Sequence, residues 1–248
     1  MKLQEIFDQL THGELSQLSI GGGAAGEITP ANYERVLAHV NLGLTALHKR
    51  FLLKEGRLVL ELMDGVTLYP LNSKYAVNGR GSRMPIRYIL DTPEAPFQDD
   101  LFKIERVFAE SGIEFPLNVS DDPYSMRTPK LDLLEVPVII VEPSTELPAE
   151  LRTETLEIYY RANHPIIRTE DGEIDPEETE VDLPYSHLEP LLYYVASRVH
   201  TPTGMTNEMN MGNAYFAKYE AACQELERLN LTPDPVAQGD RLERNGWV

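Results

Sequence analysis

The clearest pattern of apolar and polar positions lies in residues 181–200, VDLPYSHLEPLLYYVASRVH. Apolar residues recur there at spacings of three and four, which is typical of an amphipathic helix packed on one side. The stripe consists of Leu188, Leu191, Leu192, Val195, Ala196 and Val199. Pro184 suits the first turn or the entry just before it, whereas Ser186 and Glu189 have capping-box spacing and favour a later start. The sequence leaves both starts open and ends the helix at residues 201–204.

Two earlier segments also predict helices. Residues 2–18 place Leu3, Ile6, Phe7 and Leu10 on one side of a short helix. In residues 28–51, Thr29 suits the N-cap and Pro30 the first helical position. The apolar stripe of this second helix consists of Tyr33, Val36, Leu37, Val40, Leu44, Leu47 and Phe51. Gly43 is its one weak point, because glycine is a poor helix former.

From Gly56 onward the period changes to that of strands. RLVLEL and TLYPL predict two strands joined by a hairpin turn at Asp64-Gly65. The region as far as Val181 holds many prolines and four further β-prone runs, IRYIL, FKIERVFAE, VPVIIVE and TLEIYYRA. Because prolines limit long helices and central strands, we expect short strands with ordered loops, as in a small sandwich or barrel.

Residues 206–231 predict a last helix. Tyr215, Tyr219, Ala222, Leu226 and Leu229 are spaced alternately four and three apart. That seam is typical of a helix packed nearly antiparallel to a neighbour. Residues 232–248, TPDPVAQGDRLERNGWV, combine prolines and charges with the one tryptophan and read as an extended tail.

This order of elements predicts an α+β fold. Neither half of the helical set can bury its stripe alone, so we expect one helical bundle built from both ends of the chain. Residues 1–55 would form its first half and residues 183–231 its second half. A small β domain, 56–182, would be inserted between them, and 232–248 would form a C-terminal arm.

Composition narrows the classes of function. The chain has 248 residues, a formal net charge of −18 and one cysteine. The acidic balance argues against a protein that grips nucleic acid, although DNA could pass it without sticking. A single cysteine excludes an internal disulfide and a cysteine-based zinc cluster. No apolar run is long enough for a membrane span, and residues 1–10 lack the apolar region of a signal peptide, so we expect neither secretion nor membrane anchoring.

The sequence shows no catalytic signature, so we expect no catalytic residue, no metal site and no cofactor. Adjacent helical residues point in different directions, so Ser186 and His187 favour capping and surface roles over a nucleophile–base pair. His39 and His48 are nine apart on the second helix and would lie on opposite faces, a poor arrangement for a metal. Cys223 is more typical of a small buried residue than of a nucleophile.

Two polar or aromatic features allow a sharper interpretation. Arg168–Asp182 contains eight acids in fifteen residues, which suggests calcium, but the glycine comes too early for an EF-hand loop and a solvated loop is favoured. Tyr159-Tyr160 and Tyr193-Tyr194 could form an aromatic platform, although packing in a core or interface is the commoner use.

Trp247, on an extended arm, suits an anchor in a partner's pocket.

Several segments together resemble the head-to-tail adaptor proteins of tailed bacteriophages, the connectors similar to tail tubular protein A. The resemblance lies in TPANYERVLAHVNLGLTALHKRF, GVTLYPL and LEIYYRANHPII, and above all in VDLPYSHLEPLLYYVASRVHTPTG followed by NAYFAKYEAACQEL. It covers most of the chain, but its motifs are patterns rather than invariant site residues. The chain departs from shorter family members in its long β insertion.

The resemblance implies a structural virion protein at the neck of the particle, present in the host cytoplasm during assembly. It implies a homo-oligomeric ring, commonly of twelve copies, between the portal protein and the tail nozzle or tail tube. Twelve chains would carry a formal charge of about −216, so DNA could pass through the lumen without specific binding. The C-terminal arm would dock on the portal through Arg241, Arg244, Asn245, Gly246, Trp247 and Val248.

Two other classes of function stay open at this point. A carbohydrate-binding or tail-fibre-like module would use the β region and the paired tyrosines and would not need the arm. A hydrolase is the enzyme alternative, and it rests only on scattered His, Ser and acidic residues.

Overall fold

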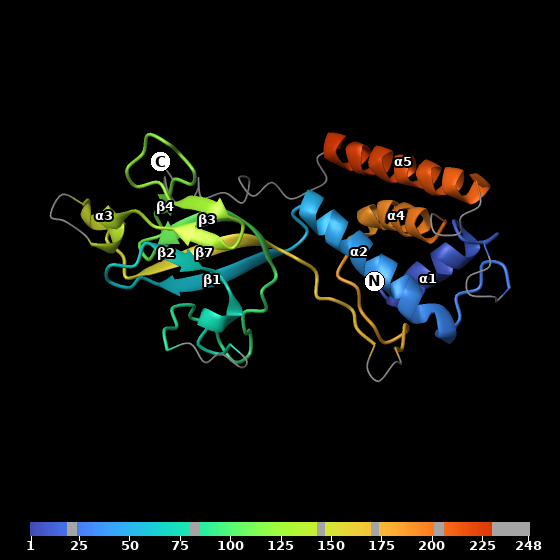
Figure 1. Ribbon diagram of the computed structural model, residues 1–248, viewed down its shortest axis with the longest axis horizontal. Helices are drawn as coiled ribbons and strands as arrows, with labels where there is room; N and C mark the ends of the chain where they lie inside the picture. The colour runs from blue at the N-terminus through green and yellow to red at the C-terminus, as the bar shows by residue number, and fades with distance from the viewer. Residues whose placement is uncertain (19–23, 80–84, 143–146, 170–173, 201–205, 230–248) are drawn as a thin grey trace, which may run out of the picture. The chain divides into compact units, whose positions relative to one another are not determined.

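The structure of the protein, a computed structural model, describes residues 1–18, 24–79, 85–142, 147–169, 174–200 and 206–229, with side chains in the last range from residue 210 onward (Figure 1). It combines helices with antiparallel sheets, as the α+β prediction requires. The chain divides into two compact units. We call Met1–Leu53 together with His164–Val248 the helical unit, and Lys54–Asn163 the β unit.

The helical unit contains elements from both ends of the chain. Its helices are α1 (Leu3–His12), the 3-10 turn Pro30–Asn32 leading into α2 (Tyr33–Arg50), the 3-10 turn Tyr185–His187 leading into α4 (Leu188–His200), and α5 (Thr206–Arg228). The predicted stripes of the first three helices are buried in one common core, with only Tyr33 and Leu188 partly exposed. Residues from both ends of the chain therefore belong to one core.

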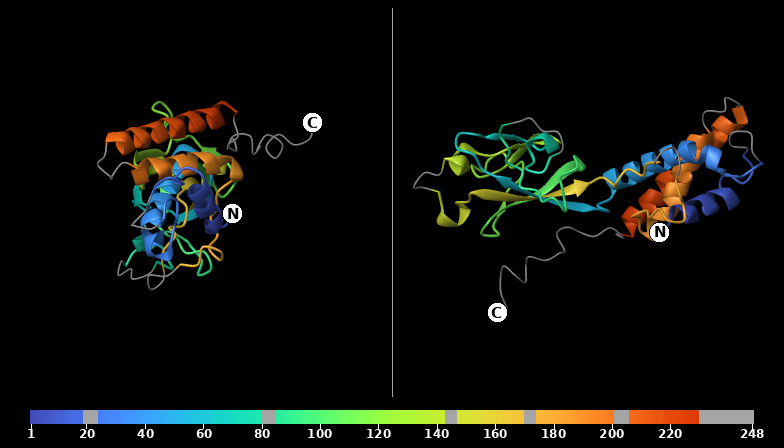
Figure 2. Two further views of the ribbon diagram at one scale, coloured as in Figure 1. Left: turned by 90° about the vertical axis from the view of Figure 1, so that its right-hand side faces the viewer. Right: turned by 90° about the horizontal axis from the view of Figure 1, so that it is seen from below.

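Helix α4 is the centre of this unit, because it contacts α1, α2 and α5. Figures 1 and 2 show α5 lying along α4 on the side away from α1 and α2. Gly43 marks the close approach of α2 and α4. A Cβ atom there would lie 2.6 Å from Cδ1 of Leu191 and 3.1 Å from Cδ1 of Tyr194. The residue that looked like a weakness of the helix is thus the one that lets α4 pack closely.

The start of α4 differs from the capping-box prediction. Pro184 is the residue before the 3-10 turn, in an extended conformation, so its interpretation as an entry residue is confirmed. Ser186 Oγ lies 3.1 Å from Nδ1 of His187, and Oε1 of Glu189 accepts a hydrogen bond from Tyr193 Oη at 2.8 Å. Because both side chains are engaged elsewhere, they do not close a capping box.

The β unit has its own core and two antiparallel sheets. The four-stranded sheet has the order β1-β7-β3-β4, and the three-stranded sheet has the order β2-β6-β5. The strands are β1 (Glu55–Glu61), β2 (Leu68–Pro70), β3 (Leu101–Ala109), β4 (Glu114–Phe115), β5 (Arg127–Lys130), β6 (Leu133–Glu135) and β7 (Thr155–Ala162). Short helical segments are Ser73–Tyr75, α3 (Val138–Val141) and Ala149–Leu151. The predicted strands FKIERVFAE and TLEIYYRA correspond to β3 and β7 and are confirmed.

The predicted hairpin of RLVLEL with TLYPL is wrong. A turn does occur at Asp64-Gly65, where Gly65 has a φ of +72°, but β1 pairs with β7 and β2 pairs with β6. Both edges at the end of β1 are occupied before the turn, since Glu61 N–H donates to Tyr88 O and Leu62 N–H donates to Glu154 O. The strand that follows the turn therefore joins the other sheet.

Two other strand predictions also fail. In VPVIIVE only Val136 makes a ladder-like bond, from its N–H to Thr67 O at 2.8 Å. Pro137 then precedes the single helical turn α3, a position that suits the fixed φ of proline. In IRYIL, Ile89 alone forms bridges, to Leu60 and to Ala76.

The end of the β unit lies nearer to the N-terminus than predicted. The unit ends at Asn163 rather than at residue 182, because residues 164–182 pack with the helices. Asn41 binds Ile167 through both of its amide atoms, Val181 N–H donates to Met1 O, and Val181 is buried in the helical core. The many acidic residues of this segment favoured a solvated loop at the end of the inserted domain. The structure shows that the apolar residues between the acids hold the segment against the helices instead.

Within the residues that the structure describes, no helix is both long enough and apolar enough to cross a bilayer. The predicted arm, 232–248, lies outside the described residues.

Candidate functional site

The six residues predicted to bind the portal, Arg241, Arg244, Asn245, Gly246, Trp247 and Val248, lie outside the described residues. The structure therefore describes the helix that precedes the arm in the chain, not the arm itself. That helix is α5, which is held in place by the elements around it.

Helix α5 packs on α4 through Tyr219, Cys223 and Leu226, which are all buried. Tyr215 and Ala222 of the predicted seam are partly buried, whereas Leu229 is 49% exposed and does not belong to it. Cys223 is fully buried, as its interpretation as a small core residue requires. Burial raises the pKa of its thiol to about 11, so Cys223 is neutral near neutral pH and is a poor nucleophile.

The end of α2 is fastened to α5 by Arg50. Its Nε lies 2.7 Å from Oε1 of Glu227, and its Nη1 lies 2.8 Å from Oε2 of Glu220. The hydrogen bond that Arg50 donates to Glu227 is the main cause that raises the pKa of Arg50, and burial opposes this shift. The sequence did not reveal this clamp, because the two partners of Arg50 lie 170 and 177 residues away in the chain.

The tyrosines of α4 are used in packing. The Tyr194 ring is buried and meets the Tyr219 ring edge-on, with centroids 5.2 Å apart. Tyr193 lies beside Tyr215, and Nζ of Lys218 sits 5.5 and 4.9 Å from the centroids of these two rings. The hydrogen bond to Glu189 raises the pKa of Tyr193 to about 12. This cluster ties α5 to α4 and offers no flat aromatic platform.

Ser186 and His187 do make contact, contrary to the sequence-based expectation. They lie in a 3-10 turn rather than in an α-helix, and the short separation of 3.1 Å joins Ser186 Oγ to His187 Nδ1. The His187 ring is buried against Phe51, with centroids 4.8 Å apart, and burial lowers its pKa. Its Nε2 has no hydrogen-bond partner among the described residues, so no carboxylate there orients the ring as a triad would require.

His39 and His48 lie on different faces of α2, as predicted. His48 is buried and its Nδ1 lies 2.9 Å from Leu44 O, whereas His39 is only half-buried. Burial, with Arg35 and Arg198 as lesser causes, lowers the pKa of His39. Across the described ranges, no three His, Cys, Asp or Glu residues are grouped as metal ligands would be. The acidic segment 168–182 is described except for 170–173, and there Asp175 caps its own turn by accepting from Glu177 N–H at 2.9 Å.

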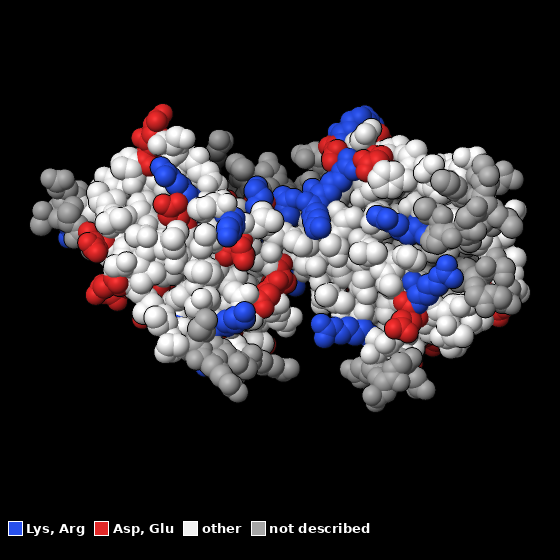
Figure 3. Space-filling view, viewed as in Figure 1, with Lys and Arg blue, Asp and Glu red and all other residues white. Residues whose placement is uncertain are grey.

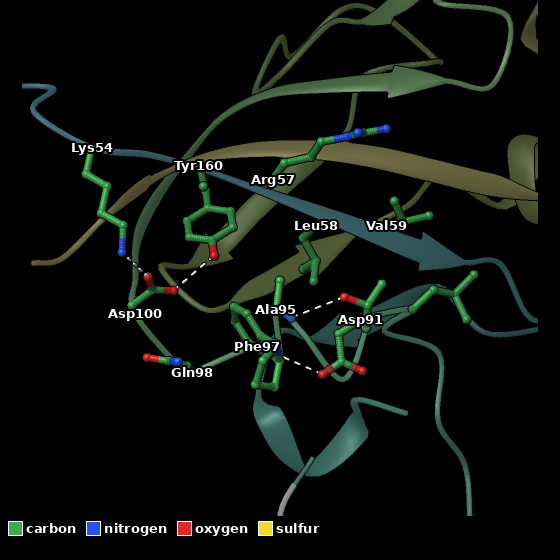
Figure 4. A pocket seen from close by; sticks show the side chains of 14 residues that line it. Lys54, Arg57, Leu58, Val59, Asp91, Ala95, Phe97, Gln98, Asp100 and Tyr160 are labelled. Carbon is green, nitrogen blue, oxygen red and sulfur yellow. Dashed lines mark hydrogen bonds and ion pairs between the residues drawn. The ribbon is translucent and has the colours of Figure 1, made fainter. Parts of the chain in front are cut away.

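The β unit holds a groove that the sequence did not reveal (Figure 4). It has a volume of about 470 Å³ and runs between β1 and the loop Leu90–Gln98. At one end, Asp100 accepts from Lys54 Nζ at 3.2 Å and from Tyr160 Oη at 3.0 Å. Burial, followed by the charge of Asp100, raises the pKa of Tyr160. Leu58, Ala95 and Phe97 line the other part.

Gly56 allows the Tyr160 ring to lie across β1. A Cβ atom at Gly56 would be 2.2 Å from Cζ of Tyr160, its direct cross-strand neighbour. Tyr160 is buried, and Tyr159 packs edge-on against Phe108 with centroids 5.5 Å apart. The second tyrosine pair therefore also serves packing, and neither ring is free to stack on a sugar.

Positively and negatively charged side chains are interspersed on the face of the molecule drawn in Figure 3. On the face in Figure 3, Lys and Arg side chains lie among Asp and Glu side chains. Some charged side chains form ion pairs at the surface, such as Lys2 with Glu180 and Arg57 with Glu157. Exposed pairs of this kind add little stability, so they mainly set the local charge of the surface.

Comparison of the sequence with protein-family models and with curated proteins gives no match in either case. The role of each residue therefore has to be argued from its own surroundings.

Proposed function

We propose that this protein is a structural virion protein, a head-to-tail adaptor that forms a ring between the portal and the tail of a tailed bacteriophage. The observation that carries the proposal is the helical unit, in which α1 and α2 from one end of the chain share a core with α4 and α5 from the other. Three of the segments that resemble the adaptor family, 29–51, 181–204 and 213–226, contribute α2, α4 and part of α5 to this core, whereas GVTLYPL and most of LEIYYRANHPII lie in the β unit.

In this proposal the helical unit is a bundle that packs beside its copies in the ring. Met211 and Phe216 on α5 support a role in contact, since these large apolar side chains are 43% and 45% exposed. The β unit is proposed to be a small sandwich. DNA would pass through an acidic ring without specific binding, consistent with the net charge of −18.

The partners in this proposal are the portal protein, the tail nozzle or tail tube protein, and further copies of the same chain. Residues 232–248 would be the arm that docks on the portal, with Trp247 as its anchor and Arg241 and Arg244 meeting acidic groups. Ordering an extended arm costs conformational entropy, so the aromatic contact has to provide much of the net gain. The protein would reside in the virion neck, and in the host cytoplasm during assembly.

The proposal assigns no catalytic residue, metal or cofactor. The rival hydrolase would need an acid beside His187, and the rival carbohydrate-binding module would need an exposed aromatic platform. The buried ring of Tyr160 and the packing of Tyr193 on Tyr215 make the second rival less suitable.

The test is binding of the full chain to the portal ring of the same phage, followed by sedimentation and electron microscopy. The wild-type chain should add a ring to the portal. Deletion of 245–248, or Trp247→Ala, should abolish attachment without changing the melting temperature. Gln238→Ala, in the same segment, is the matched control and should bind normally. Failure of the wild-type chain to join the portal would refute the proposal, and normal binding by Trp247→Ala would refute the role of the arm.

A further inference from the structure

Strand β1 is an edge strand, and its outer edge is only partly paired. Val59 O accepts from Leu90 N–H, and Glu61 N–H donates to Tyr88 O, each at 2.8 Å. These two bonds make the antiparallel bridge between Leu60 and Ile89. After Leu90 the chain leaves the edge and forms the loop that walls the groove, so the bridge is not continued toward the start of β1.

The direction of the remaining main-chain groups follows from the pairing with β7. Lys54 O accepts from Ala162 N–H and Leu62 N–H donates to Glu154 O, so the even-numbered residues of β1 are bonded to β7. In an antiparallel ladder the residues between them direct their N–H and C=O groups to the opposite side. Among the described residues, the N–H and C=O of Arg57 and the N–H of Val59 have no hydrogen-bond partner.

These unpaired groups open into the groove, and its far wall is fixed. Asp91 holds the wall by accepting from Phe97 N–H at 3.0 Å and from Asn78 N–H at 2.7 Å. A further bond from Ala95 N–H to Thr92 Oγ1 at 3.1 Å shapes the turn between them (Figure 4). The open part of the edge, residues 55–58, is long enough for about four residues of an added strand at roughly 3.3 Å per residue.

The side chains along this edge set the chemistry of an occupant. Successive residues of a strand face opposite sides, so an added residue beside Leu58 would face the apolar surface made by Leu58, Ala95 and Phe97. An added residue beside Arg57 would face the other side of the sheet. The Arg57 side chain is 63% exposed and pairs there with Glu157, so an acidic neighbour would extend this row of alternating charge.

We propose that the open edge of β1, residues 55–58, binds an extended peptide segment of a partner protein as an added antiparallel strand. Its side chains alternate between small apolar residues, which enter the groove, and an acidic residue beside Arg57. Main-chain hydrogen bonds supply affinity in this mode of recognition, and the pockets for alternate side chains supply specificity. The inference concerns the β unit alone and does not depend on the adaptor role.

The same edge of a second copy is a poorer occupant. A symmetric antiparallel pairing centred on Arg57 would place the two Arg57 side chains directly opposite each other, and like charges in that position are destabilising. A sugar is also a poorer occupant, because the Tyr160 ring is buried and its hydroxyl is engaged by Asp100.

The first experiment titrates a capped pentapeptide, SVDVS, into the full chain and follows amide hydrogen exchange by NMR. The amides of Glu55 and Arg57 should exchange at least about tenfold more slowly at saturating peptide, because both would become donors in a ladder. A matched peptide that is N-methylated at its aspartate loses the donor to Arg57 O and should not protect either amide. The proposal is wrong if neither amide is protected, or if the methylated peptide protects them equally.

The second experiment uses variants of the wall and of the charge. Ala95→Trp should fill the groove and abolish the effect, whereas Glu94→Trp, exposed and outside the groove, should retain it. Arg57→Glu, at an exposed position, should weaken SVDVS and favour SVKVS. An Arg57→Glu chain that keeps its preference for SVDVS would contradict the charge assignment. Protection of the same amides by raising the concentration of the protein alone would show that a second copy fills the edge, and would overturn the proposal.

Discussion

The helical unit and the β unit solve the problem of building a core in opposite ways. The β unit is one continuous stretch, Lys54–Asn163, with a core of its own. The helical unit draws on residues that are far apart in the chain, and α4 contacts helices from both sides of the insertion. The β unit can therefore complete its core from one continuous stretch of chain, whereas the helical unit can complete its core only when both ends of the chain are present.

The largest expected effect of this difference is on isolated fragments. The fragment 54–163 should fold alone and melt cooperatively, because its core is complete. The fragment 1–53 should not fold, since the stripe of α2 would lose its partners on α4. Joining residue 53 to residue 164 by a short Gly-Ser linker should restore a folded helical unit. Circular dichroism and NMR dispersion measure each outcome, and a folded 1–53 fragment would break the comparison.

A buried charge in the helical core should have the next largest effect. Val195 is fully buried between α4 and its neighbours, so Val195→Asp should lower the free energy of unfolding of the helical unit by about 4 kcal/mol. Arg198→Asp, at an exposed position on the same helix, is the control and should cost less than about 1 kcal/mol. The melting of the β unit should not change in either variant. An unchanged melting temperature for Val195→Asp would mean that the core has been misassigned.

In each unit a glycine allows the side chain of a neighbouring element to come close. Gly43→Leu should separate α2 from α4, and Gly56→Leu should displace the Tyr160 ring from β1 and break its bond to Asp100. We expect losses of about 2 kcal/mol in each case, confined to the unit that carries the change. Gly112→Leu is not a suitable control, because the positive φ of Gly112 would itself make the substitution strained. The control for Gly43→Leu is Leu42→Gly, a substitution at an exposed position of the same helix. Denaturant unfolding of each variant, with probes in both units, tests the confinement.

The smallest expected effect is at alkaline pH. The folded-state pKa of Cys223 is raised by burial, from an ordinary value near 9 to about 11. A raised pKa contributes stability that is fully present below about pH 9 and is lost as the pH rises through 11. The helical unit should therefore begin to lose stability at a lower pH than the β unit, whose buried groups with raised pKa are tyrosines such as Tyr88 and Tyr160. Thermal melts of wild type and Cys223→Ala from pH 8 to 11 measure this, and an equal slope in both would exclude the thiol as the cause.

Local patterns predicted the helices well and the strand partners poorly. The stripes of α1, α2 and α4 could be read from spacing because a helix bonds to itself, and its buried face depends only on the local sequence. The turn at Asp64-Gly65 could also be read locally, but not that β1 would find β7 about a hundred residues later. Which strands pair with each other depends on which strand edges are already hydrogen-bonded, and a short stretch of sequence does not contain that information.

The same limit applies to the candidate sites. The burial of Cys223 was predictable from its place beside an apolar seam, whereas the clamp of Arg50 on Glu220 and Glu227 was not, because charged side chains give no periodic signal. The groove could not be predicted, since Lys54, Asp91 and Asp100 come together only after β1 and the loop have folded. The Ser186–His187 contact was missed because a 3-10 turn was taken for an α-helix.

The two ends of the β unit are neighbours in one ladder, since Lys54 O accepts from Ala162 N–H at 3.0 Å. A mechanical pull on both connections would therefore load the β1–β7 hydrogen bonds one pair at a time, starting with Lys54 and Ala162 and passing to the next bonded pair, Gly56 and Tyr160. Strands that are peeled apart in this way resist far less force than strands sheared along their length, where many bonds carry the load together. The β unit would yield early to tension that enters through its own connections and resist tension applied elsewhere, which single-molecule pulling from residues 54 and 163 can compare with other attachment points.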